Sequence, residues 1–337
     1  MIYPKFINEN DIIGVTSPSD GVHKPEKINR LNNAIKQINE LNFKTKETTN
    51  VRTSYKGSSS TALVRAKQLE ELYEDKEVKA IICSSGGDFL LEILSHINLD
   101  IIKSNPKWLQ GFSDPTGLLY TITTNLDIAT IYGHNFTSFG MKPWHKSLKE
   151  NLEILKGNII EQKNFEKYES EYTSLTTGYE PYNLTKKVYW KVLNKEDKTT
   201  LKGRIIGGCL DVLNDLFGTR FDNTKNFINK YKNDGIIWYF DNCELSSEQL
   251  IRTLWKLKDN GYFNYSTGII FGRSATEKSY YDISFEEAIL HILKDLNIPI
   301  IINTDIGHVP PTITIINGAI AKISVEKGKG TINFILE

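Results

Sequence analysis

Residues 79–94 read KAIICSSGGDFLLEIL, and residues 107–122 read KWLQGFSDPTGLLYTI. Each segment starts with a short apolar run that is typical of a buried strand, passes through a turn, and continues with apolar residues at helical spacing. Strands that are separated by helices in this way form β-α-β units, in which the strands are parallel. These two segments therefore predict an α/β fold built on a parallel sheet.

The same alternation continues on both sides of these segments. Residues 11–17 and 128–133 are short and apolar, which predicts two more buried strands. Residues 25–41 and 60–74 place apolar side chains every three or four positions, which predicts two amphipathic helices. We therefore expect residues 1–157 to form an N-terminal α/β domain with a Rossmann-like parallel sheet.

The second half of the chain has a different pattern. Residues 158–200 are polar and rich in tyrosine without a clear period, so we expect a linker or an insertion with some strand content. Short strands and helices then alternate again, which predicts a smaller C-terminal domain of mixed α+β structure over residues 201–337. Ser246 opens one of these helices with a capping box, and the Asn317-Gly318 pair near the end predicts a hairpin.

Composition narrows the classes of function. The 337 residues include 41 basic and 41 acidic side chains, so the formal charge is zero and nucleic acid is not an expected partner. The three cysteines lie far apart, which argues against a disulfide framework and a structural zinc site. The sequence shows neither a signal peptide nor an apolar run of about 18 residues, so we expect a cytoplasmic location and no membrane partner. The P-loop and GxGxxG patterns are absent, and we expect no metal and no cofactor.

Two turns between a strand and a helix contain residues that can carry chemistry. Gly86-Gly87 is either a tight turn or a pair of backbone N–H groups that binds an anion or an oxyanion. Ser113 lies in a Ser-Asp-Pro stretch that is either an ordinary helix start or a nucleophile elbow. An elbow exposes the serine oxygen at a helix N-terminus, which suits attack on a carbonyl carbon. Both interpretations stay open on these residues alone.

A nucleophilic serine needs a base and a carboxylate that orients the base. His308 and His134 each follow an apolar strand, and the carboxyl ends of strands carry the ligands in open α/β sheets. Two prolines stiffen the chain after His308, which favours this histidine as the base and leaves His134 as the rival. Asp241 ends the apolar run 235–241 and is the candidate acid, with Glu244 as the alternative.

The segments that carry these residues occur in an order that resembles the LD-carboxypeptidase family of serine peptidases, which also contains the microcin C immunity peptidases. KWLQGFSDPTGLL resembles the family's nucleophile segment, Gly-x-Ser-Asp-x-Thr, and AIICSSGGDFLLEIL resembles its double-glycine loop. GRIIGGCLDVLNDLFGT resembles the start of the family's second domain. WYFDNCELSSEQL resembles the acid strand, and NTDIGHVPPT resembles the histidine loop. The likeness extends over nearly the whole chain.

The resemblance implies a catalytic triad with Ser113 as nucleophile, Asp241 as orienting acid and His308 as base. It also implies an oxyanion hole made by the backbone amides of Gly87 and Asp114. The nucleophile would belong to the N-terminal domain, and the acid and the histidine to the C-terminal domain. Family members are commonly homodimers, so we expect a homodimer.

Two positions depart from the family pattern. Asp241 stands where the family normally has Glu, so a carboxylate that is one methylene shorter must reach the imidazole. Ser85 stands where many members have Arg, directly before Gly86-Gly87. Ser85 and Gly86 are the substrate-binding residues that the resemblance implies. The absent arginine would change how a substrate carboxylate is held.

The function that the resemblance implies is hydrolysis of an amide bond next to a D- or modified residue. The first expected substrate is a muropeptide tetrapeptide that loses its terminal D-alanine during cell-wall recycling. The alternative is a peptidyl-nucleotide antibiotic of the microcin C type, whose nucleobase could stack on Trp144 or Trp190. A catalytically impaired homologue that only binds peptide is the rival from another class, and the departure at Asp241 supports it.

Overall fold

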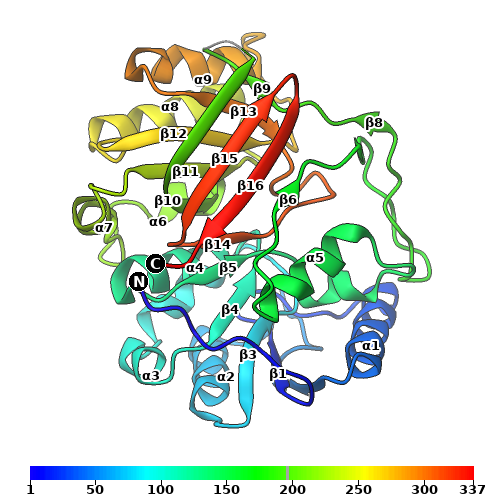
Figure 1. The fold of residues 1–337 in the computed structure, drawn as a ribbon. Coiled ribbons are helices and arrows are strands. Elements are labelled where there is room, and N and C mark those ends of the chain that lie inside the picture. Colours follow the sequence, from blue (N-terminus) through cyan, green and yellow to red (C-terminus); the bar gives the residue numbers. More distant parts are fainter. Residues whose placement is uncertain (195–196) are drawn as a thin grey trace. The chain divides into compact units, whose positions relative to one another are not determined.

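The computed structural model describes residues 1–194 and 197–337. The described chain forms two compact units, and each unit contains its own large β-sheet (Figure 1). Neither unit is one continuous stretch of the chain. The first unit comprises Met1–Ile160, Glu171–Asn183 and Thr314–Asn317. The second unit comprises Glu161–Ser170, Leu184–Ile313 and Gly318–Glu337.

The sheet of the first unit has the strand order β14-β5-β4-β3-β1-β2. Its parallel strands are β1 (Ile12–Thr16), β2 (Lys44–Glu47), β3 (Val78–Cys83), β4 (Trp108–Gly111) and β5 (Thr130–Tyr132), and β14 (Ile315–Asn317) is antiparallel to β5. β4 is buried along its whole length, as expected for a strand inside a parallel sheet that helices flank. The predicted α/β class with a parallel N-terminal sheet is confirmed.

Helices connect these strands, as the spacing of the apolar residues predicts. They are α1 (Pro25–Glu40), α2 (Ala62–Glu74), α3 (Leu99–Ser104), α4 (Thr116–Leu126) and α5 (Lys146–Leu155), with the 3-10 helices η1 (Leu90–Ser95) and η2 (Phe136–Gly140). The apolar pattern after Gly87 suggests an α-helix, but the structure has only η1 there. The N–H of Leu90 donates to the Asp114 carboxylate at 2.9 Å, and Asn98 already caps α3, which leaves the segment little room to extend.

The sheet of the second unit is mixed and has the order β6-β16-β15-β10-β11-β12-β13-β9. Its central strands β10 (Lys198–Cys209), β11 (Ile236–Asp241), β12 (Ser266–Gly272) and β13 (Ile300–Thr304) are parallel, and β6 (Gln162–Lys163), β9 (Lys191–Val192), β15 (Ile320–Glu326) and β16 (Lys329–Ile335) are antiparallel to their neighbours. Every residue of β11 is buried, so this strand lies in the core. The predicted mixed structure of the C-terminal part is confirmed.

The helices of the second unit follow the pattern that the sequence predicts. They are α6 (Leu210–Leu216), α7 (Thr224–Lys230), α8 (Ser247–Asp259) and α9 (Phe285–Leu293), with the 3-10 helix η3 (Lys294–Leu296). The predicted capping box at the start of α8 is present. The Ser246 hydroxyl accepts the N–H of Gln249, and the Gln249 side chain accepts the N–H of Ser246.

Residues 158–200, for which we expect a linker or an insertion, are shared by the two units. Glu171–Asn183 belongs to the first unit, and the flanking parts contribute β6, β7 (Lys167–Tyr168), β8 (Lys186–Lys187) and β9 to the second. β6 and β9 form the two edges of the second sheet, and β7 pairs only with β8. Short edge strands are half-exposed, which explains why this stretch lacks the apolar period of a central strand. Residues 195–196 lie outside the described residues.

The prediction of a hairpin at Asn317-Gly318 is wrong. β14 ends at Asn317 and pairs with β5 of the first unit, whereas β15 begins at Ile320 and pairs with β10 and β16 of the second. Gly318 does turn with a φ of 85°, but its N–H donates to the carbonyl oxygen of Ile205 at 2.8 Å. An Asn-Gly pair signals a turn without specifying which strands follow it, and here the turn takes the chain from one sheet to the other.

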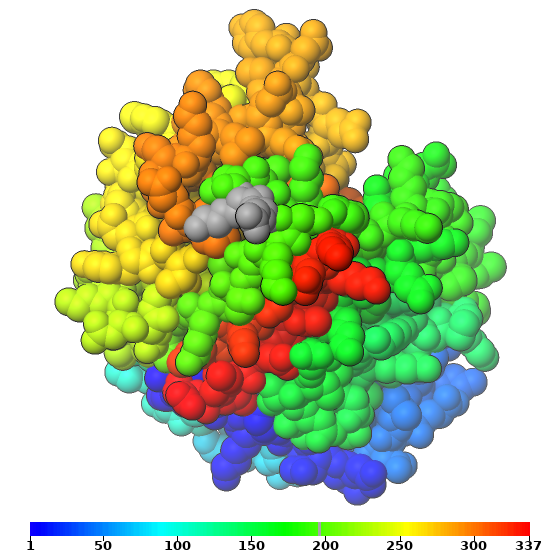
Figure 2. Space-filling view, turned by 45° about the horizontal axis from the view of Figure 1, so that its top comes forward, coloured from blue at the N-terminus to red at the C-terminus, as the bar shows by residue number. Residues whose placement is uncertain are grey.

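The loop between β12 and α9, drawn in orange, projects from the surface at the top of Figure 2. Its side chains Tyr280 and Tyr281 are 80% and 78% exposed. With Glu248, Ile251 and Arg252 of α8, they line an open pocket of about 590 Å³. The Glu248 carboxylate accepts the backbone N–H groups of Tyr280 and Tyr281, so its role is to hold the loop. None of these lining residues is a serine or a histidine, so the candidate catalytic groups lie elsewhere.

Candidate active site

Ser113 lies in the turn between β4 and α4, at the carboxyl end of a parallel strand. Its backbone φ is 69°, in the left-handed region that costs a residue with a side chain roughly 1–2 kcal/mol. The N–H of Thr116 donates to the carbonyl oxygen of Ser113 at 2.9 Å and closes the turn. Pro115 occupies the N-cap position of α4, so an N-cap role does not explain this serine. Strained residues of this kind are concentrated at functional sites.

The double-glycine loop approaches Ser113 closely within the first unit. A Cβ placed on Gly86 would lie 3.0 Å from both Cβ and Oγ of Ser113 and 3.8 Å from the backbone nitrogen of Asp114. Gly87 has a φ of 153°, and a Cβ there would collide with the Ser19 hydroxyl. Gly86 therefore lets the loop backbone lie directly against the candidate nucleophile, and Gly87 lets it lie against Ser19 and Asp20.

The side chains of Asp114 and Ser85 are engaged inside the first unit. The buried Asp114 carboxylate accepts the Ser19 hydroxyl and, at 2.9 Å, the N–H of Leu90, and burial raises the pKa of this carboxyl group. The Ser85 hydroxyl donates to the carbonyl oxygen of Asp20 at 2.9 Å. Asp114 therefore ties the nucleophile turn to its flanking loops through its side chain, which leaves its backbone as the part that could contact a substrate.

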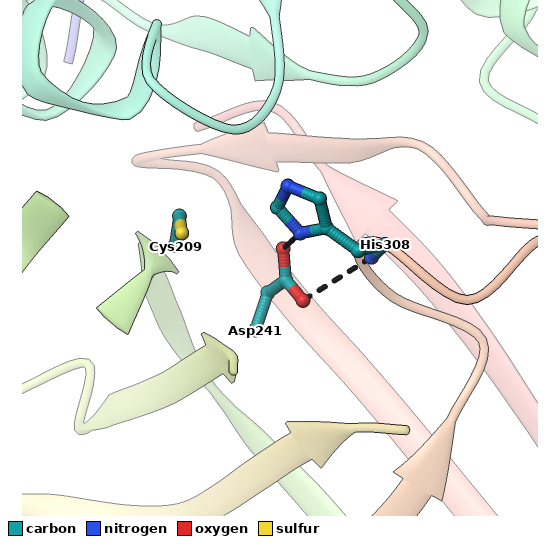
Figure 3. A group of neighbouring side chains, drawn as sticks. All are labelled: Cys209, Asp241 and His308. Atoms are coloured by element: carbon teal, nitrogen blue, oxygen red, sulfur yellow. Dashed lines mark hydrogen bonds and ion pairs between the residues drawn. The ribbon is translucent and has the colours of Figure 1, made fainter. Parts of the chain in front are cut away.

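Asp241 and His308 lie together in the second unit (Figure 3). Asp241 is the last residue of β11 and is fully buried, and His308 lies in the loop after β13. Oδ2 of Asp241 is 2.6 Å from Nδ1 of His308, and Oδ1 accepts the backbone N–H of His308 at 3.2 Å. Gly307 has a φ of 92°, and a Cβ there would overlap the Asp241 carboxylate. The shorter acid therefore reaches both the ring and the backbone of the histidine.

Burial and the charge of Asp241 act in opposite directions on the pKa of His308. Burial alone would lower the pKa of His308, but the negative charge and the hydrogen bond of Asp241, together with the contribution of Cys243, outweigh it. The pKa of His308 is therefore held well above its ordinary value. Because Nδ1 faces the carboxylate, Nε2 is the ring nitrogen that is positioned to exchange a proton with a reacting group.

A buried carboxylate supports the start of the histidine loop. Asp305 directly follows β13, and its Oδ1 accepts Nη1 of Arg273 at 2.6 Å. Its Oδ2 accepts Nε1 of Trp190 at 2.9 Å and the N–H of Phe165 at 3.2 Å. Burial raises the pKa of Asp305, while the charge of Arg273 and these hydrogen bonds act in the opposite direction. Asp305 therefore joins the loop to distant parts of the second unit.

Arg273 supports the other end of the same loop. Its Nη2 donates to the carbonyl oxygen of Val309 at 2.8 Å and to that of Pro311 at 3.0 Å. The guanidinium thus binds the backbone on the far side of His308 while it pairs with Asp305 on the near side. The sequence analysis missed both residues. The sequence signal that could have identified them is their position at the carboxyl ends of strands, since Arg273 directly follows β12 and Asp305 directly follows β13, and Asp241 is the last residue of β11.

Asp211 fixes the chain that follows the candidate acid. Its carboxylate accepts the backbone N–H groups of Cys243 at 3.0 Å, Glu244 at 2.8 Å and Leu245 at 3.1 Å. Glu244, the alternative acid, is exposed, whereas Asp241 is buried against the imidazole. The sequence analysis also missed Asp211, whose role becomes visible only when the loop folds back over α6.

His134, the rival base, is buried in the first unit beside Phe139. Burial, with a smaller contribution from the nearby His145, lowers the pKa of His134 to about 3. Its backbone carbonyl accepts Nε2 of Gln110 at 2.7 Å, and among the described residues no partner contacts its own Nε2. These are the features of a neutral histidine that is packed into a core.

The two tryptophans considered for nucleobase stacking differ in exposure. Trp190 is buried at 1% exposure and donates to Asp305, so its ring has no face open to a ligand. Trp144 is half-buried, packs against Phe139 at 5.3 Å between ring centroids, and donates Nε1 to the carbonyl oxygen of the same residue at 2.7 Å. Trp190 therefore serves the histidine loop, which the sequence alone does not reveal.

A serine in a strained turn and a buried aspartate–histidine pair are the parts of a serine hydrolase. Residues 13–133 match the LD-carboxypeptidase N-terminal domain, and residues 202–323 match the LD-carboxypeptidase C-terminal domain. The chain belongs to the LD-carboxypeptidase family and is a serine peptidase. Among the described residues, every helix is too short or too polar to span a bilayer.

Named relatives have similar lengths. The chain is 25% identical over 325 residues to a probable murein peptide carboxypeptidase of Bacillus subtilis, covering 95% of this chain and 91% of that protein. It is 26% identical over 269 residues to the microcin C7 self-immunity protein MccF of Escherichia coli, covering 76% of this chain and 74% of that protein. The solved structure of MccF in complex with aspartyl sulfamoyl adenosine matches with a TM-score of 0.84 and 22% identity over 100% of both chains. That last likeness concerns the fold.

Proposed function

We propose that this peptidase is an LD-carboxypeptidase that removes the terminal D-alanine from a muropeptide tetrapeptide by a Ser113-His308-Asp241 triad. The observation that carries the proposal is the two-point contact between Asp241 and His308, which fixes both the imidazole ring and the backbone of the histidine. Such a pair prepares a histidine to act as base and then as acid. The strained turn at Ser113 supplies the serine that the pair would activate.

The proposed reaction moves one proton back and forth. The hydroxyl proton of Ser113 passes to Nε2 of His308 while Oγ bonds to the substrate carbonyl carbon. The N–H groups of Gly87 and Asp114 would stabilise the oxyanion. The C–N bond then breaks, Nε2 gives the proton to the leaving amine, and an acyl-enzyme remains. Water attacks the acyl carbon, its proton goes to Nε2 and then to Oγ, and the shortened peptide leaves.

Ser85 and Gly86 are the proposed contacts to the substrate. Gly86 lies directly against Ser113, so its backbone would border the scissile bond. Ser85 lacks the charge of the arginine that many family members have at this position, and its hydroxyl already donates to Asp20. The side chain at this position therefore offers a substrate carboxylate neither a positive charge nor a free donor, and we expect a weaker preference for a free C-terminal carboxylate.

The second candidate is detoxification of a peptidyl-nucleotide antibiotic. It is favoured by the E. coli relative, which is a microcin C7 self-immunity protein, and by the structure of MccF in complex with aspartyl sulfamoyl adenosine. Both candidates require cleavage of an amide bond by an activated serine, so they differ only in what flanks that bond. Trp144 is the partly exposed tryptophan that a nucleobase could reach.

One assay separates these candidates from a peptide-binding homologue. The full chain is incubated with an L,D-tetrapeptide muropeptide and, separately, with a microcin-like aminoacyl nucleotide, and products are identified by mass spectrometry. D-alanine release that Ser113→Ala abolishes supports the carboxypeptidase. Cleavage of the nucleotide conjugate alone supports the detoxifying peptidase. Binding of either compound without turnover would establish the impaired homologue and reject the triad.

We further propose that the peptidase works as a homodimer in the cytoplasm, as the family resemblance implies. The substrates named above are small, and neither requires a membrane or a nucleic acid. Light scattering after size exclusion measures the mass of the assembly directly, and 38.4 kDa is the mass of one chain. A mass that stays at this value at micromolar concentration would contradict the dimer.

A further inference from the structure

A third donor lies beside the aspartate–histidine pair. The Cys209 sulfur, a carboxylate oxygen of Asp241 and a ring nitrogen of His308 all lie within 4.8 Å of one another (Figure 3). No other cluster of this kind, with three or more acidic, cysteine or histidine side chains, occurs in residues 1–194 and 197–337. Cys209 and Asp241 are paired in the parallel register of β10 and β11, so both side chains extend from the carboxyl ends of neighbouring strands.

The three donors suit a thiophilic divalent cation. Sulfur, imidazole nitrogen and carboxylate oxygen are the usual ligands of Zn²⁺, at about 2.3, 2.0 and 2.1 Å respectively. A tetrahedral ion would hold the nitrogen and oxygen about 3.3 Å apart, and Nδ1 and Oδ2 are now 2.6 Å apart. The histidine loop would therefore have to move to admit the ion, whereas Cys209 and Asp241 are buried at the ends of neighbouring strands.

The surroundings favour a positive charge at this point. The carboxylates of Asp241 and Asp211 both face the Cys209 thiol, and Asp211 accepts a hydrogen bond from it at 3.4 Å. An Asp–His pair alone offers two ligands, and the adjacent thiol turns the pair into a three-ligand site.

We propose that Cys209, Asp241 and His308 form a binding site for a thiophilic divalent cation such as Zn²⁺, and that the cation inhibits the peptidase. The ion takes the place of the proton between Nδ1 and Oδ2. On binding, the Cys209 thiol and Nδ1 of the protonated imidazole each release one proton to solvent, and the imidazole binds the ion through Nδ1 with its remaining proton on Nε2. Nε2 then cannot accept the proton of a serine. Cation binding stands without the proposed function, whereas the inhibition rests on it.

Cobalt reports the ligand set directly. The full chain is freed of metal with a chelator and titrated with Co²⁺, and the absorption spectrum is recorded. We expect one equivalent of Co²⁺ to produce a thiolate-to-cobalt charge-transfer band that Zn²⁺ removes by displacement. Cys209→Ser should lose this band and bind Zn²⁺ at least about 100-fold more weakly. Cys83→Ser is the matched control, because Cys83 is a buried strand cysteine of the first unit, and it should keep both.

Two results would overturn the site: a titration of the wild type without a charge-transfer band, or a band that Cys209→Ser retains. Circular dichroism of each variant checks that its fold is intact, and Cys209→Ala is the second variant if the serine is not tolerated. These measurements need no substrate, so an inactive chain would still test the binding.

Inhibition is measured separately with whichever amide substrate is cleaved. For each protein, the rate is expressed relative to its own metal-free rate. The Zn²⁺ concentration that halves this rate should be at least about 100-fold higher for Cys209→Ser than for the wild type, and a chelator should restore the wild-type rate. Stoichiometric Zn²⁺ binding at Cys209 with an unchanged rate would reject the inhibitory role. Failure of the proposed function would appear differently, as no turnover even in the metal-free protein.

Discussion

The nucleophile turn and the histidine loop position their candidate catalytic groups by different physical means. Ser113 is held by backbone conformation, since its left-handed φ and the glycine at position 86 define where its oxygen lies. His308 is held by buried charge, since Asp241 binds its ring and its backbone and Arg273 binds the loop that follows. The conformation of the nucleophile turn is determined by residues that are adjacent in the sequence, whereas the histidine loop depends on partners far away in the sequence.

The largest expected effect is on the nucleophile itself. Ser113→Ala should lower kcat by about 10³–10⁶-fold, because no other group replaces the attacking oxygen. The fold should stay intact, since the methyl group fits wherever the serine fits. Steady-state kinetics and circular dichroism check both halves. Turnover close to that of the wild type would show that Ser113 is not the nucleophile and that the strained turn does not position a catalytic group.

The next largest effect tests the charge that holds the histidine. Asp241→Asn should lower kcat by about 10²–10⁴-fold, because an amide can select the wrong imidazole tautomer and cannot stabilise imidazolium. Glu244→Gln is the matched control and should keep nearly full activity, since Glu244 is exposed. Asp241→Glu should remain active because it restores the usual residue of the family. A fully active Asp241→Asn together with an inactive Glu244→Gln would show that Glu244, and not Asp241, is the orienting acid.

The third effect tests whether the histidine loop depends on remote charge. Arg273→Met leaves Asp305 buried without its cation and should reduce the free energy of unfolding by about 3–5 kcal/mol. Lys198→Met removes one partner of an exposed pair with Glu326 and should cost less than about 1 kcal/mol. Urea unfolding of both variants measures the difference. Equal stabilities would mean that the Arg273–Asp305 pair contributes no more than a surface pair.

The fourth effect concerns pH. Because Asp241 holds the pKa of His308 above its ordinary value, neutral imidazole appears only at higher pH. The acid limb of kcat/KM should therefore lie above pH 6.5, the approximate pKa of an unperturbed histidine. His134→Asn should leave the limb in place, because the pKa of His134 is already lowered to about 3 by burial. A limb at or below pH 6.5, or one that moves in His134→Asn, would contradict the assignment of the base.

The smallest effect measures the strain in the nucleophile turn. Ser113→Gly should be more stable to urea than Ser113→Ala by about 1 kcal/mol, because glycine adopts a φ of 69° without steric cost. Both variants lack the hydroxyl group, so the comparison isolates the backbone. Equal stability of the two variants would show that the turn carries no strain to relieve.

Much of the fold and the first candidates for the site follow from local sequence. The alternation of strands and helices predicts the parallel sheet of the first unit, and the capping box predicts the start of α8. Asp241 and His308 could be proposed because each lies at the end of an apolar run. Their pairing was implied by the family resemblance, whereas the two contacts that Asp241 makes, one to the ring and one to the backbone of His308, are visible only in the structure.

What the sequence could not predict depends on contacts between distant segments. Arg273 and Asp305 act on the histidine loop from two different strands, and Asp211 acts on a loop more than thirty residues away. The Asn317-Gly318 turn was assigned to a hairpin because its local signal is the same in both settings. A turn signal specifies backbone angles and leaves the pairing partner undetermined.

The short strand β14 has a consequence for the order in which the protein can be completed during synthesis. β14 comprises only Ile315–Asn317, yet it covers the edge strand β5 of a sheet whose other strands all precede residue 133. Until nearly the whole chain has left the ribosome, the outer edge of β5 remains open to pairing with other chains. The nascent first unit therefore needs protection from aggregation until Ile315–Asn317 become available, after all of the second unit except Gly318–Glu337 has been translated.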